Sequence, residues 1–193
     1  MKPVCIVILL FWQCADLEAQ KLEDLATIVN KVYIDVHDTL IRCYAIKPDK
    51  NMKIVSNQNY YWYRDNTILM TMGGYDGRLL DGPYKVFYPT KNLIEEGQFK
   101  SGIKQGQWKS WYENGALKAV VNWSSSRKNG SFTIYDSSGT KTRSGNYKND
   151  QLDGKITDYL GNGKTIKFKY NSGVLETDEK ATSNSIDSTA NHK

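Results

Sequence analysis

One glycine recurs at a constant interval from residue 82 onward, and this repeat constrains the fold more than any other feature. Gly82, Gly106, Gly130 and Gly154 are each separated by 24 residues. Large apolar residues, mostly aromatic, keep fixed distances from these glycines, and the columns hold Tyr84, Trp108, Phe132 and Ile156; Phe87, Trp111, Tyr135 and Tyr159; and Tyr75, Phe99, Trp123 and Tyr147. A period of this length is typical of repeat arrays, in which each unit packs on its neighbours.

Each unit has the pattern of a β-hairpin. Residues 106–112 favour a strand and contain no proline, and they are followed by Asn114-Gly115, a dipeptide that suits a tight turn because both residues tolerate a positive φ. Gly139 and Gly163 mark the same turn in later units, and residues 116–123 form the return strand. The repeat therefore predicts an all-β fold, an elongated antiparallel meander of repeated hairpins.

Strand alternation also predicts which side chains share a face. Trp108, Ser110 and Tyr112 should point to one face of the sheet, and Trp111 to the other. The repeated glycines, from Gly82 to Gly154, are expected to leave room for bulky neighbours. They are also expected to give the backbone freedom where strands begin.

The repeat domain is predicted to span residues 57–175. Residues 57–80 are a degenerate first unit with the aromatic run YYWY, and the later units are 81–104, 105–128, 129–152 and 153–175, with the final strand at 167–170. Residues 20–56 form a lead, expected as a short helix and then a strand that cover the first sheet edge, although 32–36 and 41–46 suit two strands equally well. The polar residues 176–193 are expected to be a disordered tail.

The first 19 residues have the layout of a secretory signal. Lys2 precedes a short apolar run, and a polar stretch predicts cleavage after Ala19. Lipid attachment at Cys14 and an uncleaved anchor remain as alternatives. Cleavage after Ala19 leaves Cys43 as the one cysteine, in an apolar segment where it is expected to be a small buried residue.

Three stretches carry a resemblance to a known family. FKSGIKQGQWKSWYENGALK (99–118), YDGRLLDGPYKVFY (75–88) and YKNDQLDGKITDYLGNGK (147–164) resemble MORN repeats, particularly the 24-residue bacterial variant, with Ser126 and Asp150 in place of its turn glycine. The resemblance covers residues 57–175 and implies a hairpin array with an interaction role. Together with the signal, it is similar to exported proteins of Bacteroidota-type bacteria. The variant is sometimes labelled an antitoxin, which an export signal does not suit.

The chemistry of the sequence predicts binding rather than catalysis. We expect no catalytic residues, no cofactor and no metal, because acids, bases and nucleophiles do not converge; Asp35-x-His37-Asp38 is a weak metal pattern that a polar loop explains better. The candidate binding residues are aromatic side chains interleaved with lysines, although core packing explains most of the aromatics equally well: Tyr84, Tyr88, Trp108, Trp111, Tyr112, Trp123, Tyr135, Tyr147, Lys85 and Lys109.

The expected partner is an envelope protein, bound by a non-enzymatic scaffold exported to the periplasm or outer membrane. Anionic lipid headgroups or a polysaccharide are the alternative partner, and an antitoxin role would apply if the chain were not exported. The formal net charge is +5, and the lysines are dispersed rather than clustered, so nucleic acid is not an expected partner.

Overall fold

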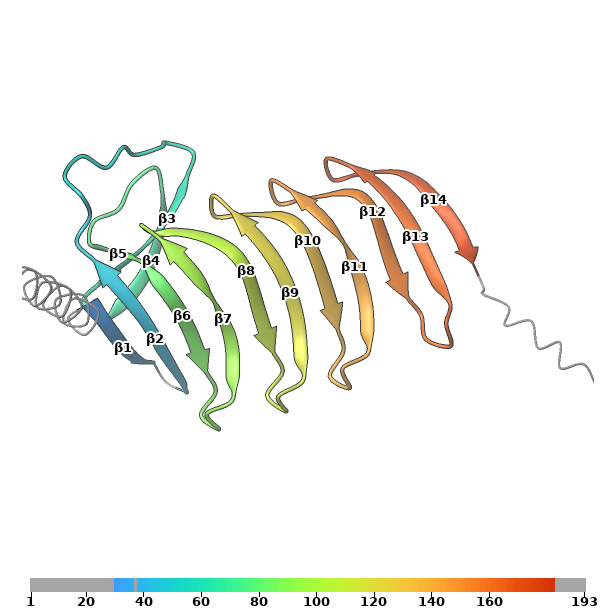
Figure 1. The fold of residues 1–193 in the computed structure, drawn as a ribbon, viewed down its shortest axis with the longest axis horizontal. Coiled ribbons are helices and arrows are strands. Elements are labelled where there is room, and N and C mark those ends of the chain that lie inside the picture. The colour runs from blue at the N-terminus through green and yellow to red at the C-terminus, as the bar shows by residue number, and fades with distance from the viewer. Residues whose placement is uncertain (1–29, 37, 183–193) are drawn as a thin grey trace, which may run out of the picture.

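The fold is a single layer of antiparallel hairpins. The computed structural model describes residues 30–36 and 38–182, with side chains as far as residue 176. Within these residues the strands join in one 14-stranded sheet (Figure 1). The strands are β1 (Lys31–Val36), β2 (Thr39–Ile46), β3 (Asn59–Arg64), β4 (Thr67–Met72), β5 (Arg78–Leu80), β6 (Gly82–Phe87), β7 (Leu93–Lys100), β8 (Ile103–Trp111), β9 (Leu117–Ser124), β10 (Arg127–Tyr135), β11 (Lys141–Lys148), β12 (Gln151–Tyr159), β13 (Thr165–Asn171) and β14 (Val174–Thr182).

From β6 to β14 every strand pairs with the next strand in the chain. Figure 1 shows these hairpins as curved ribbons that follow one another along the longest axis of the molecule. The predicted all-β meander of repeated hairpins is therefore confirmed.

The two ends of the hairpins use different turns. At one end, two consecutive residues have a positive φ, as in the type I′ turn that joins twisted strands; the pairs are Ser101-Gly102, Ser125-Ser126, Asn149-Asp150 and Ser172-Gly173. The sequence placed this geometry at Asn114-Gly115, at the opposite end, and that detail is wrong. At Asn114-Gly115 only the glycine has a positive φ, whereas both residues of the equivalent Asn162-Gly163 do. The Gly115 N–H donates to the Tyr112 carbonyl at 2.9 Å. This closes a type I turn followed by a left-handed glycine.

The glycine column that defines the repeat is required by backbone conformation, not by space. Gly106 and Gly154 have φ of 72° and 73°, and a Cβ on either would meet no atom within 4 Å. A register shift lies beside the equivalent glycine in β10, between Lys128 and Phe132. Left-handed residues and register shifts bend strands, which accounts for the curvature of the hairpins in Figure 1. The expectation that these glycines make room is therefore wrong for Gly106 and Gly154, whereas a Cβ on Gly130 would lie 3.3 Å from Cβ of Asn122.

Room for bulky side chains is made by a different pair of glycines. A Cβ on Gly97 would lie 2.2 Å from the Trp108 ring, and one on Gly145 would lie 2.3 Å from Cδ1 of Ile156. Both distances are far below van der Waals contact. Gly97 and Gly145 therefore allow the inward residue of the next strand to lie against the sheet.

Hydrogen bonds between successive units explain the period. The Ser126 N–H donates to the Lys104 carbonyl at 2.9 Å, and the Asp150 N–H donates to the Lys128 carbonyl at 2.9 Å. At the opposite end, the Asn114 side chain donates to the Ser137 carbonyl at 2.9 Å. Each hairpin is therefore attached to its neighbour at both ends, and the 24-residue spacing brings each turn back to the same place on the preceding unit.

The N-terminal end does not continue the meander. β2 pairs with both β5 and β6, while β5 also pairs with β3, and β3 with β4. The hairpin predicted as a degenerate first unit does form, but β2 takes its expected place beside β6. That hairpin lies against the array instead: the Tyr61 N–H donates to the Gly102 carbonyl at 2.7 Å, and the rings of Tyr61 and Phe99 are 5.0 Å apart.

The lead covers the sheet edge with strands rather than with a helix. β1 pairs along its full length with β2, and the two place Ile34 and Cys43 in the core, where each is 1% exposed. From residue 31 onward the lead forms β1 and β2, and its first nine residues (20–28), where the helix was expected, lie outside the described residues together with residue 29 and the signal. Cys43 is buried as expected, and burial raises the pKa of its thiol to about 11.

The C-terminal end is longer than predicted. β14 pairs with β13 from Asn171–Val174 to Thr165–Thr182. Residues 176–182, which were assigned to a disordered tail, are therefore part of a strand, and β13 is not the final strand. Residues 183–193 lie outside the described part of the chain.

The main core lies where the β3–β4 hairpin meets the array. Phe99 and Trp108 are at its centre with ring centroids 5.1 Å apart, and Leu80 is fully buried beside them. Further along, Phe132 is buried against Tyr147, with ring centroids 4.5 Å apart. The aromatic columns of the repeat therefore supply the core, as aromatic side chains bury large areas in a chain with few aliphatic residues.

Candidate functional site

Four of the predicted binding residues help to hold the array together. Trp108 is only 3% exposed, and its Nε1–H donates to the Gln105 carbonyl at 3.1 Å. Half-buried Tyr84 and Trp123 pack against the same core, and Tyr147 packs on Phe132. A buried indole with a satisfied N–H presents no free group to a ligand.

Tyr88 and Tyr112 join neighbouring units. The Tyr88 hydroxyl donates to the Trp111 carbonyl at 3.3 Å, and the Tyr112 hydroxyl donates to the Tyr135 carbonyl at 2.9 Å. All four of these side chains are half-buried. Their packing roles are visible, whereas a role in binding stays a prediction.

The two candidate lysines lie side by side on another surface. Lys85 and Lys109 flank Glu96 across three neighbouring strands, and the Lys85 Nζ is 3.6 Å from a Glu96 carboxylate oxygen. Together with Gln98 and Gln107 they line a shallow hollow of about 260 Å³. This surface is polar and carries both signs of charge.

Lys104 is a buried lysine that the sequence analysis missed. The residue is 8% exposed, with Nζ 3.5 Å from the ring centroid of Trp108 and 4.3 Å from that of Trp123. Burial lowers the pKa of Lys104, and Glu95 opposes this with an ion pair at 3.4 Å. Lys104 stands 24 residues after Leu80 and so occupies an equivalent position in the repeat. Its burial could not be expected from the sequence, because lysines are rarely buried unless paired. Lys104 stabilises the packing of Trp108 and Trp123 by cation–π contact.

The outer edge of β4 is an exposed apolar strand, which we call the β4 edge (residues 67–72). β4 pairs with β3, and no described strand pairs with its other side. Its six residues, TILMTM, carry no charge, and Leu69, Met70 and Met72 are 37%, 52% and 67% exposed. Edge strands are usually protected by charge, proline or a covering segment. The β4 edge shows none of these among the described residues.

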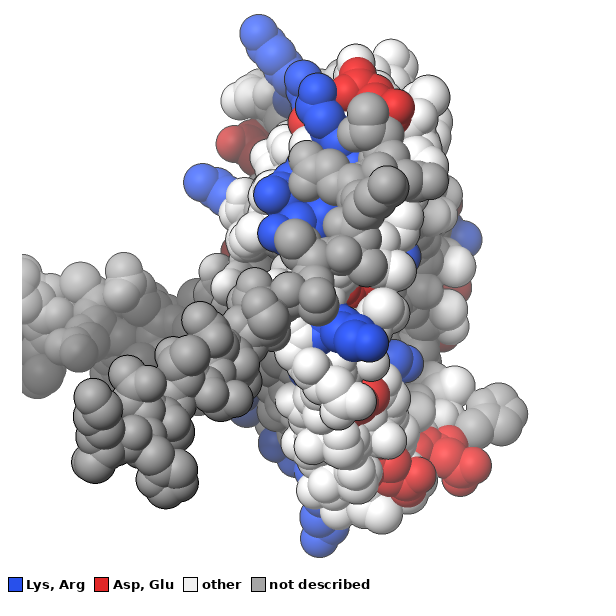
Figure 2. Space-filling model, turned by 90° about the vertical axis from the view of Figure 1, so that its right-hand side faces the viewer, with Lys and Arg blue, Asp and Glu red and all other residues white. Residues whose placement is uncertain are grey.

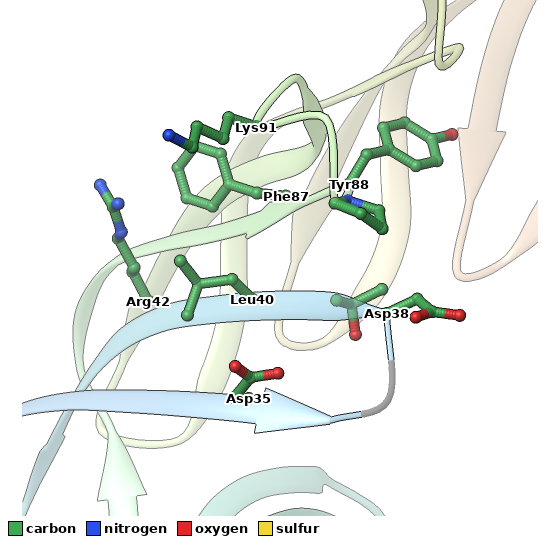
Figure 3. Close-up of a pocket in the computed structure, with 9 residues that line it drawn as sticks. Asp35, Asp38, Leu40, Arg42, Phe87, Tyr88 and Lys91 are labelled. Carbon is green, nitrogen blue, oxygen red and sulfur yellow. The ribbon is translucent and has the colours of Figure 1, made fainter.

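A hollow of about 500 Å³ lies between β1, β2 and the turn that joins β6 to β7 (Figure 3). Asp35, Leu40 and Phe87 are direct neighbours in register across β1, β2 and β6, and all three line it. Arg42 and Lys91 line the same hollow, and the Arg42 Cζ is 4.7 Å from the Phe87 ring centroid. We refer to this feature as the β1–β2 hollow.

The structure describes two of the three residues in the weak metal pattern Asp35-x-His37-Asp38. Asp35 and Asp38 both line the β1–β2 hollow, whereas His37 lies outside the described residues. Among the side chains described, those of residues 30–36 and 38–176, no three from His, Cys, Asp or Glu are grouped closely enough to hold a metal ion.

The repeated hairpins and their connecting hydrogen bonds agree with a comparison of the sequence with protein families. The sequence model of the MORN repeat variant matches residues 80–101 and 104–124. These two segments match MORN repeats. A comparison with curated proteins found no match.

The matched residues correspond to the units predicted at 81–104 and 105–128. The hairpins at 129–152 and 153–175 lie outside the match, but they have the same left-handed turn pairs, at Asn149-Asp150 and Ser172-Gly173. The N–H groups of Asp150 and Gly173 also repeat the connecting hydrogen bonds, to the carbonyls of Lys128 and Leu152 at 2.9 Å. The MORN geometry thus continues past the matched segment.

MORN repeats generally serve as non-catalytic scaffolds that bind proteins or lipids. Two surface features of this chain lie wholly or partly outside the repeated hairpins. The β4 edge precedes the matched residues, and the β1–β2 hollow combines the first matched unit with the lead. No helix within the described part of the chain is long and apolar enough to span a membrane.

Proposed function

We propose that this protein is a non-catalytic exported scaffold that binds a protein partner in the bacterial cell envelope. The observation that carries the proposal is the β4 edge. The backbone groups on its outer side can pair with an extended segment of another protein, because strand addition needs only an open edge. Exposed Leu69, Met70 and Met72 supply apolar contacts on both faces of the added strand. The partner segment is therefore an extended, apolar strand.

The rival partner is an anionic surface, such as lipid headgroups or a polysaccharide. Such binding needs positive charge gathered on one face. Figure 2, a view onto the β14 end of the array, shows both Lys or Arg and Asp or Glu side chains on that end. Lys85 is also paired with Glu96. These observations favour a protein partner over a polyanion.

The partner experiment is a pull-down from envelope extract at low and high salt, with wild type and with Met70→Lys. A lysine at residue 70 places a charge on the β4 edge and should abolish capture of a defined protein. Leu160→Lys is the matched control, because Leu160 is also exposed, at 58%, but lies after β12 in a distant turn. Wild type and the control should capture the protein at both salt concentrations, since apolar contacts resist screening.

Two outcomes would contradict the proposal. Equal capture by Met70→Lys and wild type would show that the β4 edge is not the binding surface. Binding only to anionic matrices, with loss at high salt, would favour the rival partner.

Export is tested separately by mass spectrometry of the native N-terminus. A chain that begins at Gln20 supports secretion, and a lipid-modified Cys14 supports attachment to a membrane. Retention of Met1 in the cytosol would contradict export and would favour the antitoxin alternative.

A further inference from the structure

We propose that the β1–β2 hollow binds a carboxylate carried on an apolar group, the chemistry of the C-terminal residue of a partner protein. The proposal rests on the proposed function as a protein-binding scaffold and adds a second, chemically defined contact. It follows from three observations: the position of Lys91 in the repeat, the placement of Arg42 and Lys91 beside Phe87, and the carboxylates on the other side of the hollow.

Lys91 stands where the other three hairpins have glycine. Counting by 24 residues from Lys91 gives Gly115, Gly139 and Gly163, and these glycines have φ of 84°, 85° and 71°. The backbone of Lys91 has a φ of 69°. Residues other than Gly, Asn and Asp rarely adopt this left-handed conformation. Backbone strain of this kind is often found at functional sites. The presence of lysine at this glycine position is one reason to assign its side chain a role in binding.

Arg42 lines the same hollow as Lys91. Neither cation forms an ion pair with a carboxylate of the described residues, whereas Lys85, Lys104 and Arg143 each do. In Figure 3 the charged ends of Arg42 and Lys91 lie on the same side of the Phe87 ring. The Arg42 guanidinium, held 4.7 Å from this ring, retains N–H donors for a carboxylate.

The remaining lining selects a single carboxylate over a polyanion. Asp35 and Asp38 face the same hollow, with the apolar side chain of Leu40 between them and the cations. These carboxylates repel a second negative group, but they can accept hydrogen bonds from the N–H groups of a peptide. Phe87 and Leu40 provide an apolar surface for the ligand's side chain. A volume of about 500 Å³ is within the usual range for ligand sites.

The test uses a fluorescent hexapeptide that ends in leucine with a free carboxylate, and its C-terminally amidated twin. Binding to the full chain is measured by fluorescence anisotropy, with N-acetyl-leucine as competitor. The free acid should bind at least tenfold more tightly than the amide. Competition by N-acetyl-leucine at comparable concentration would show that a small free acid satisfies the site and would overturn the assignment to a protein C-terminus.

Lys91→Gly separates this role from a structural one. It restores the residue that the repeat uses and should therefore raise the melting temperature. It should also weaken binding of the free-acid peptide at least fivefold. Lys164→Ala, which removes an exposed lysine from the turn between β12 and β13, should leave binding unchanged. The β4 edge is untouched by Lys91→Gly, so capture of the pull-down partner through that edge should persist.

Several results would overturn the inference. Equal binding of the acid and the amide would exclude carboxylate recognition. Unchanged peptide affinity in Lys91→Gly would show that Lys91 does not serve the site. Binding to phosphatidylglycerol vesicles but not to the peptide would assign the hollow to a lipid. Each leaves the result at the β4 edge intact, so failure here and failure of the proposed function are distinguishable.

Discussion

At the scale of single residues, the glycines of this chain serve two distinct physical purposes. Gly106 is needed for its left-handed backbone and has open space where a side chain would be. Gly97 is needed for its small size, because the Trp108 ring occupies the position of a Cβ. The sequence revealed the first group through its period, whereas Gly97 and Gly145 stand two residues before Phe99 and Tyr147 and gave no separate signal.

Alanine at Gly97 should destabilise the fold by about 1 to 3 kcal/mol, the usual cost of overpacking a core. Trp108 must move, because its ring atoms lie 2.2 Å from the added Cβ. Urea unfolding measures the loss. Gly74→Ala is the control, since it has no positive φ and no atom within 4 Å of its added Cβ. Equal stability of the two variants would show that Trp108 does not pack on Gly97.

At the scale of elements, the period predicted the strands that repeat and could not predict those that do not. β6 to β13 follow from the columns of glycine and aromatic residues. The position of β2 beside β6 depends on pairing between residues 40 and 87, for which a repeat pattern carries no information. The tail was misassigned because residues 176–182 are polar, yet an outer strand of a single-layer sheet needs few apolar side chains.

Truncation tests the assignment of β14. Removal of the chain after residue 175 should lower the free energy of unfolding by about 1 kcal/mol or more, because β13 loses its outer partner. Truncation after residue 182 is the matched control and should leave stability unchanged. If both truncated chains unfold at the same urea concentration as the full chain, residues 176–182 do not contribute a strand.

At the scale of the whole molecule, the array and its N-terminal end have different tasks. The repeated units stabilise one another through aromatic contacts and connecting hydrogen bonds, and most of the predicted binding aromatics are engaged there. The β4 edge lies in the part where the period fails, and the β1–β2 hollow lies where that part meets the first repeat unit. Sequence analysis could identify the family and the array, but exposure of the β4 edge depends on a fold that no period encodes. Of the cations in the hollow, Lys91 could have been found from the sequence, because it interrupts a glycine column.

The central claim is that a partner protein adds a strand at the β4 edge. Amide hydrogen exchange of residues 67–72, compared between the free chain and its complex with the captured partner, tests it most directly. In an edge strand the outward N–H groups exchange rapidly. We expect these amides to be protected in the complex, while amides in β10 to β12 keep their exchange rates. Unchanged exchange in residues 67–72, with new protection confined to the repeat hairpins, would contradict the claim.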